Sequence, residues 1–175
     1  MIKIVTRNVV CGGSVGAEIP MEAASRLPGT EYDPTSFPGV RFRAGGCTVL
    51  LFATGKIVSV GAVTDRGAFD AMDAVVNLLK ANGIAVGNVT LRVHNVVATA
   101  NIGSCIDLGR VVRVMPRSLY EPEHFPGVII RRRDPKATIL LFASGKLVCV
   151  GARSVDGASD AVNQLRSDLA SEGLI

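Results

Sequence analysis

The stretch LLFATGKIVSVGA (residues 50–62) returns ninety residues later as LLFASGKLVCVGA (residues 140–152). With two more residues at the N-terminal side, the copies are TVLLFATGKIVSVGA and TILLFASGKLVCVGA, which are identical at eleven of fifteen positions. Two other segments recur in the same order: YDPTSFPGV (32–40) as YEPEHFPGV (120–128), and RNVV (7–10) as HNVV (94–97). An internal repeat of this kind predicts two copies of one structural unit.

Length and composition fit two small half-domains. The chain has 175 residues, and we assign residues 1–87 to the first repeat and residues 88–175 to the second. Apolar residues make up 48% of the chain, but no apolar run is long enough to cross a bilayer, and the N-terminus predicts no export signal. The four cysteines lack CxxC spacing, so reduced thiols are favoured and neither a metal nor another cofactor is expected. The net charge of +4 favours an acidic partner, including nucleic acid.

Each repeat is predicted to contain one strand, a short helix, three further strands and a longer helix. Alternating β-branched residues indicate the strands, and amphipathic spacing with a glycine stop indicates the second helix. This order predicts an α+β fold in which both helices of a repeat cover one face of an antiparallel sheet. The predicted strands are 2–10, 39–44, 48–53 and 56–63, then 91–100, 128–133, 137–143 and 146–153; the predicted helices are 19–28, 64–83, 106–116 and 154–173.

The predicted sheet has a second apolar face that the helices cannot cover. In KIVSVGA, Val58 and Val60 point away from Ile57 and Ser59, and both sets face apolar neighbours. An exposed apolar surface of this size is typical of a binding face, although stacking of two sheets or homodimerisation would also bury it. Asn8 and Asn95 lie in the middle of apolar strands, where a buried amide without a partner would be costly. The minor groove of A·T-rich DNA offers acceptors for such amides.

Four phenylalanines and four basic residues support the same interpretation. Each repeat has two rings next to turns, where a ring is positioned to enter a base step and kink the duplex. Basic side chains at turns and strand edges are placed where phosphates would pass. The rings are Phe37, Phe52, Phe125 and Phe142, and the basic residues are Arg43, Lys56, Arg131 and Lys146.

With these motifs in place, the chain resembles the TATA-box-binding protein family in its archaeal, tail-less form. The resemblance covers almost all of residues 3–172 and is most specific in YEPEHFPGVIIR (120–131) and LLFASGKLVCVGAR (140–153). It implies a saddle made of one curved ten-stranded antiparallel sheet, with four helices on the convex face. It also implies that Phe37 and Phe52, and likewise Phe125 and Phe142, are intercalating pairs. The implied base and groove contacts are Asn8, Val10, Pro38, Leu50, Val58, Val60, Asn95, Val97, Pro126, Leu140, Val148 and Val150, and the implied phosphate contacts are Arg43, Lys56, Arg131 and Lys146.

The function implied by the resemblance is that of a general transcription initiation factor, not an enzyme. Such a factor binds and bends TATA-box DNA through the minor groove and recruits transcription factor B and RNA polymerase, with Glu121 and Glu123 matching the family's docking site for transcription factor B. The implied location is the archaeal cytoplasm at the nucleoid, or the nucleus in a eukaryote. The sequence departs from the family at Val60 and Val150, where threonine is usual.

Three alternatives to this function remain. One is a protein-interaction or regulatory module with weak or no DNA specificity, and a second is self-association through the concave face in the absence of DNA. The third is a DNA-binding accessory domain of a repair or nuclease enzyme.

Overall fold

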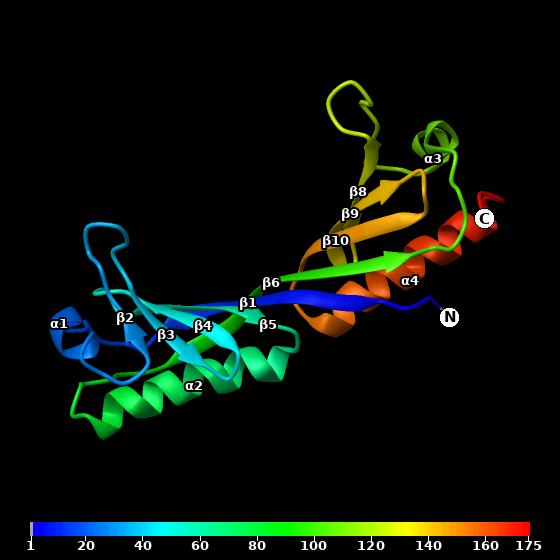
Figure 1. The fold of residues 1–175 in the computed structure, drawn as a ribbon. Coiled ribbons are helices and arrows are strands. Elements are labelled where there is room, and N and C mark those ends of the chain that lie inside the picture. Colours follow the sequence, from blue (N-terminus) through cyan, green and yellow to red (C-terminus); the bar gives the residue numbers. More distant parts are fainter. Residues whose placement is uncertain (1) are drawn as a thin grey trace. The chain divides into compact units, whose positions relative to one another are not determined.

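A computed structural model describes residues 2–175, and its elements follow the order expected from the repeat (Figure 1). The first repeat contains β1 (Val5–Ser14), α1 (Met21–Ala24), β2 (Thr30–Glu31), β3 (Val40–Ala44), β4 (Cys47–Leu51), β5 (Lys56–Ala62) and α2 (Asp65–Ala81). The second contains β6 (Thr90–Asn101), α3 (Leu108–Val114), β7 (Ser118–Leu119), β8 (Gly127–Arg133), β9 (Lys136–Phe142), β10 (Lys146–Ala152) and α4 (Val155–Ser171).

The strands form one ten-stranded antiparallel sheet in the order β2-β3-β4-β5-β1-β6-β10-β9-β8-β7. If each strand is replaced by its counterpart in the other repeat, this order reads the same from both ends. The predicted fold class is therefore confirmed in its α+β character, its repeat, its ten strands and its four helices. Two compact units can be distinguished by their internal contacts: Asn8–His94, called the first unit, and residues 2–7 together with Asn95–Ile175, called the second unit. The division at residues 87 and 88 stays a prediction.

In each unit, alternation along the strands decides which side chains enter the core. In the first unit α2 packs on β3, β4 and β5, and in the second unit α4 packs on β9 and β10 (Figure 1). Beneath α2, the side chains of Phe42, Val49, Leu51 and Ile57 are at most 2% exposed. Both long helices begin at a hydroxyl cap that accepts a hydrogen bond at 2.9 Å, Thr64 from the amide of Gly67 and Ser154 from that of Gly157.

Several element boundaries differ from the predictions, each for a local reason. The helix predicted over residues 19–28 shrinks to the four residues of α1, which begins directly after Pro20. Strand β1 continues past the predicted end at Val10 and includes Gly12 and Gly13, because its pairing with β5 runs on to Ser14. The sequence pattern did not indicate β2 and β7 individually, since each contains only two residues.

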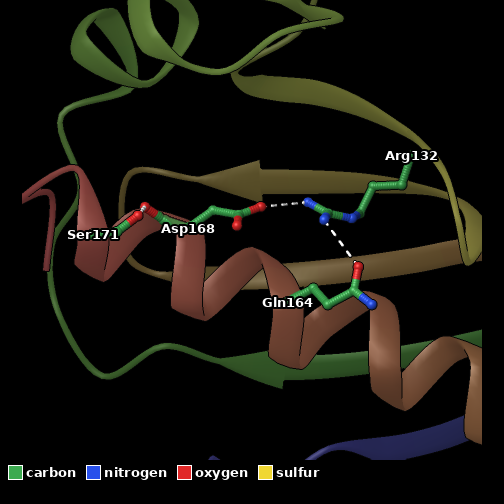
Figure 2. A network of polar contacts seen from close by, with 4 residues as sticks. All are labelled: Arg132, Gln164, Asp168 and Ser171. Carbon is green, nitrogen blue, oxygen red and sulfur yellow. Dashed lines mark hydrogen bonds and ion pairs between the residues drawn. The ribbon is translucent and has the colours of Figure 1, made fainter.

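A polar clamp fixes the end of β8 to α4 in the second unit. The Nη1 atom of Arg132 donates to Oδ2 of Asp168 at 2.8 Å, and Nη2 donates to Oε1 of Gln164 at 3.1 Å (Figure 2). Ser171 in turn donates to the carbonyl of Asp168 (Figure 2). The side chain of Arg132 is only 17% exposed, so its charge is compensated largely by the helix.

Candidate nucleic-acid interface

The face of each half-sheet opposite to the long helix, which we call the open face, carries the predicted groove contacts. In the first unit, the register of β4 and β5 places these residues on the same face, because Leu50 pairs with Val58 and Thr48 with Val60. Equivalent pairs in the second unit join Leu140 to Val148 and Thr138 to Val150. Side chains that are directly opposite in an antiparallel pair lie on the same face. All predicted groove contacts of this face are half-buried rather than buried: Asn8, Val10, Leu50, Val58, Val60, Asn95, Val97, Leu140, Val148 and Val150.

The structure brings the predicted phenylalanines together in pairs. The ring centroids of Phe37 and Phe52 are 5.7 Å apart, and those of Phe125 and Phe142 are 5.6 Å apart. Both pairs are tilted by about 60°, a favourable arrangement for aromatic rings. All four rings are half-buried, and the adjoining Pro38 and Pro126 are exposed. Each pair is therefore a rigid apolar projection rather than part of the core.

Glycine makes the ring pairing possible, a role that the sequence alone does not reveal. A Cβ on Gly39 would lie 2.8 Å from Cε1 of Phe37 and 3.1 Å from Cε1 of Phe52. A Cβ on Gly127 would lie 2.9 Å from Cε1 of Phe125 and 3.0 Å from a backbone oxygen. Because such distances are too short for real contacts, any side chain here would separate the rings. The Pro-Gly sequence is the only signal, and it also fits an ordinary turn.

The two predicted asparagines share one hydrogen-bonding pattern. Asn8 Oδ1 accepts from the amide of Gly61 at 2.8 Å, and Asn95 Oδ1 accepts from the amide of Gly151 at 2.7 Å. Both glycines have positive φ, 96° and 82°, which favours glycine over other residues. With the carbonyl oxygen occupied, each side-chain amide keeps its NH₂ group to donate to a ligand. The asparagine is thereby oriented as a donor, which the sequence alone did not reveal.

The predicted basic residues lie beside these groups and are exposed. Lys56 and Lys146 are the first residues of β5 and β10, directly after the turns that follow Phe52 and Phe142. Arg43 forms an exposed ion pair with Glu31 at 3.5 Å, whereas Arg131 has no ion-pair partner within residues 2–175. Arg41, which we did not predict, places its guanidinium 4.6 Å from the ring centroid of Phe37.

The acidic residues of YEPE lie in the exposed turn between β7 and β8. In the first unit the equivalent carboxylate, Asp33, accepts from the hydroxyl of Thr35 at 2.6 Å and from its amide at 3.0 Å. These hydrogen bonds lower the pKa of Asp33. In the second unit no side-chain hydrogen bond is found for Glu121 or Glu123, and both are exposed. Only the second unit therefore presents unengaged carboxylates at this turn.

Neither a catalytic nor a metal centre is evident in the described part of the chain. No cluster of three or more His, Cys, Asp or Glu within residues 2–175 could hold a metal ion. Burial raises the pKa of the Cys149 thiol to about 11, and burial together with the charge of Asp65 does the same for Cys11. These thiols are thus unreactive at neutral pH. No helix among these residues could span a membrane.

Comparison with known proteins gives consistent matches over nearly the whole chain. The family model described as "Transcription factor TFIID (or TATA-binding protein, TBP)" matches residues 3–82 and 90–171. A TATA-box-binding protein from Pyrobaculum calidifontis is 37% identical over 172 residues, which cover 96% of this chain and 86% of that protein. One from Pyrococcus abyssi is 36% identical over 178 residues, covering 99% and 93%. The solved structure of Methanococcus jannaschii TBP is 34% identical, with a TM-score of 0.78 and coverage of 97% and 99%.

Proposed function

The chain belongs to the TATA-binding protein family of non-enzymatic, DNA-binding transcription factors, and on this premise we propose that it binds and bends A·T-rich promoter DNA through the minor groove. The observation that carries the proposal is the open face. In both units it combines apolar side chains, an asparagine oriented as a donor and an adjoining pair of rings. No other surface of the described residues unites these three features in both repeats.

Each open-face group has a chemical role on DNA. The valines and leucines are suited to the apolar sugar edges of the groove floor, and the amides of Asn8 and Asn95 can donate to the acceptors of A·T pairs. Each ring pair is suited to opening a base step, which costs a few kcal/mol per step. Burial of apolar surface and release of counterions by Lys56 and Lys146 offset this cost. Flexible steps such as TA are kinked most easily, so deformability adds to the preference for A·T-rich sites.

Val60 and Val150 make the proposed interface more apolar than the family's usual pattern. Each pairs with a threonine of the neighbouring strand, Thr48 and Thr138 respectively. The two valines bring only methyl groups to the bases. Selectivity at the bases they cover is expected to depend on shape and on deformability rather than on hydrogen bonds.

A second part of the proposal concerns recruitment. We propose that Glu121 and Glu123 dock transcription factor B, which in turn brings RNA polymerase to the promoter. The support is that these carboxylates are exposed and unengaged, whereas Asp33, the counterpart of Glu121, is held by Thr35. Glu121→Lys should leave DNA affinity unchanged and reduce formation of the ternary complex with transcription factor B. Asp33→Lys is the matched control and should not affect that complex; equal loss in both variants would contradict the docking role.

A gel-shift titration tests the central proposal. The protein is titrated against a duplex containing a TATA element and against a scrambled duplex of the same composition, each at two salt concentrations. We expect tighter binding to the TATA duplex and a marked loss of affinity at the higher salt. Equal affinity for both duplexes, or no binding, would instead favour the alternative of a protein-interaction or regulatory module. Size-exclusion chromatography without DNA would show whether two copies associate through the open face.

A further inference from the structure

The proposed DNA contacts cannot by themselves distinguish the two directions of a promoter. Every residue assigned to the rings, the groove floor and the phosphates has an identical counterpart in the other repeat, for example Asn8 and Asn95, or Val60 and Val150. Because duplex DNA is also nearly two-fold symmetric, a reader built only from these residues would bind equally in both orientations. Any preference must come from positions at which the two open faces differ.

One such difference is a pair of residues at equivalent places in the two units. In the second unit, Nε of Arg7 donates to Oγ1 of Thr99 at 2.9 Å. Thr99 pairs directly with Val148, so its side chain is on the open face. Arg7, Thr99 and Val148 line a hollow of about 660 Å³ that also includes Phe142 and Lys146.

In the first unit the corresponding residues are His94 and Gly12. A Cβ on Gly12 would lie 2.8 Å from Cδ2 of His94 and 2.9 Å from Nε2, so the imidazole occupies the place of the missing side chain. Gly12 pairs with Val58, so a side chain on Gly12 would point to the open face, and the imidazole of His94 that takes its place lies on that face. His94 and Gly12 line a hollow of about 450 Å³, together with Lys56 and Arg92. The donor–hydroxyl pair of one unit is thus replaced by an imidazole lying over glycine in the other.

These two arrangements differ in hydrogen-bonding capacity toward the minor groove. An A·T pair presents only acceptors there, whereas a G·C pair adds the donor N2 amino group of guanine. The guanidinium of Arg7 contains only donors, so it can satisfy acceptors but not that amino group. Neutral imidazole has one donor and one acceptor nitrogen, so His94 can accept a hydrogen bond from guanine. The Arg7 side should therefore exclude G·C more strongly than the His94 side.

We propose that the Arg7–Thr99 and His94–Gly12 pairs set the orientation of this protein on asymmetric promoter sites. The half-site that contains a G·C pair is read by the first unit, and the pure A·T half-site is read by the second unit. This inference rests on the proposed function, since it assumes binding through the open face. It assigns specificity to four residues that lie outside the repeated contact set.

The natural cysteines offer a direct measurement of orientation. Among the four thiols only Cys105 is exposed, and it belongs to the second unit. The adjacent Ser104 packs against the Gly145 turn that precedes Lys146, because a Cβ on Gly145 would lie 2.3 Å from the Ser104 carbonyl oxygen. An iron–EDTA probe attached to Cys105 should therefore cut DNA near the half-site that the second unit reads. The test duplex has one G·C pair in one of two otherwise matched A·T half-sites.

The decisive variant exchanges the two pairs in one protein: Arg7→His and Thr99→Gly with His94→Arg and Gly12→Thr. Wild-type protein should cut the A·T half-site in preference, by on the order of tenfold, and the exchange variant should cut the other half-site. Exchange of a difference on the exposed side of the long helices, Lys80→Ala with Ala170→Lys, is the matched control and should retain the wild-type pattern. An unchanged pattern in the four-residue variant, or reversal in the control, would overturn the inference.

Two further readouts separate this inference from the proposed function and from misfolding. If the wild-type protein fails to bind either duplex, the proposed function fails before orientation can be measured. The half-exchange Arg7→His with Thr99→Gly makes the two units alike at these positions and replaces both side chains by smaller ones, so it should abolish the preference while retaining binding to a fully A·T duplex. A preserved preference in this variant would overturn the inference even if the four-residue exchange does not fold.

Discussion

Phe142 is the residue whose removal tests the ring pairs most directly. Its ring lies 5.6 Å from that of Phe125 and is half-buried, so Phe142→Ala should shorten the projection without opening the core. We expect a loss of about 1–3 kcal/mol in DNA-binding free energy, the range for one base–aromatic contact, and a smaller bend. Fluorescence energy transfer between the ends of a labelled duplex measures the bend. Phe69→Ala, on helix α2, is the control; an unchanged bend in Phe142→Ala would refute the wedge role.

Lys146 tests the electrostatic part of the interface. It is exposed at the start of β10, directly after the turn that follows Phe142. If Lys146 contacts a phosphate, Lys146→Ala should weaken binding to all sequences alike and reduce the slope of log K against log salt by about 1. Lys80→Ala, in the last turn of α2, should leave that slope unchanged. An unaltered slope for Lys146→Ala would show that no phosphate is bound there.

At the residue scale, the sequence revealed the side chains of the candidate site better than their geometry. The repeat singled out the four phenylalanines and both asparagines, because a side chain kept in two copies stands out. The glycines that shape the site, Gly39 and Gly127 next to the rings and Gly61 and Gly151 beneath the asparagines, are also kept in both copies, but repetition alone did not reveal their role. Glycine has no side chain, so its role can be recognised only from neighbours brought close by folding.

At the element scale, long amphipathic helices and long strands could be predicted, and short or irregular elements could not. Helices α2 and α4 have 17 residues each and lie close to their predicted ranges, because their apolar stripe repeats over several turns. Strands β2 and β7 have two residues each, too few to show alternation. The Gly12–Gly13 part of β1 was not predicted, because glycine is usually unfavourable within a strand.

The Arg132 clamp is an element-scale feature that exists in one repeat only. The residue equivalent to Arg132 in β3 is Ala44, which cannot form this clamp; in the first unit Ser59 of β5 instead donates a hydrogen bond of 3.3 Å to the carbonyl of Ala68 in α2. Arg132→Ala removes hydrogen bonds to Asp168 and Gln164, and we expect a loss of about 1–2 kcal/mol in unfolding free energy. A denaturant titration that is monitored by circular dichroism measures this loss. Arg66→Ala breaks the exposed Arg66–Asp70 pair and should cost almost nothing; equal effects would deny the clamp any special role.

At the scale of the whole molecule, duplication explains both the fold and the limits of the site prediction. Two copies with the same order of elements give a strand order that reads alike from both ends. The repeat therefore indicated two copies of one unit with four predicted strands each, and it paired every candidate contact with a counterpart, whereas the number of ten strands was implied only by the family resemblance. The repeat does not mark the positions at which the copies diverge, such as Arg7 and His94. Only such positions can give a two-fold symmetric DNA-binding protein a preferred orientation on its site.

The free energy of unfolding of the whole molecule should decrease at alkaline pH because two thiols are buried. The pKa values of Cys11 and Cys149 are raised from 9.0 to about 11, mainly by burial. Between these values the unfolded chain releases its thiol protons while the native protein keeps them, so the unfolding free energy must decrease as pH rises. The contribution is fully present below pH 9 and is lost progressively toward pH 11.

Urea titrations at several pH values measure this dependence. Cys149→Ala should flatten the decrease between pH 9 and pH 11, since one of the two raised pKa values is then absent. Cys105→Ala removes an exposed thiol and should leave the slope as in the wild-type protein. A slope in Cys149→Ala as steep as that of Cys105→Ala would mean that the thiol of Cys149 ionises as readily in the native protein as in the unfolded chain. That result would contradict the complete burial of Cys149 in the structure.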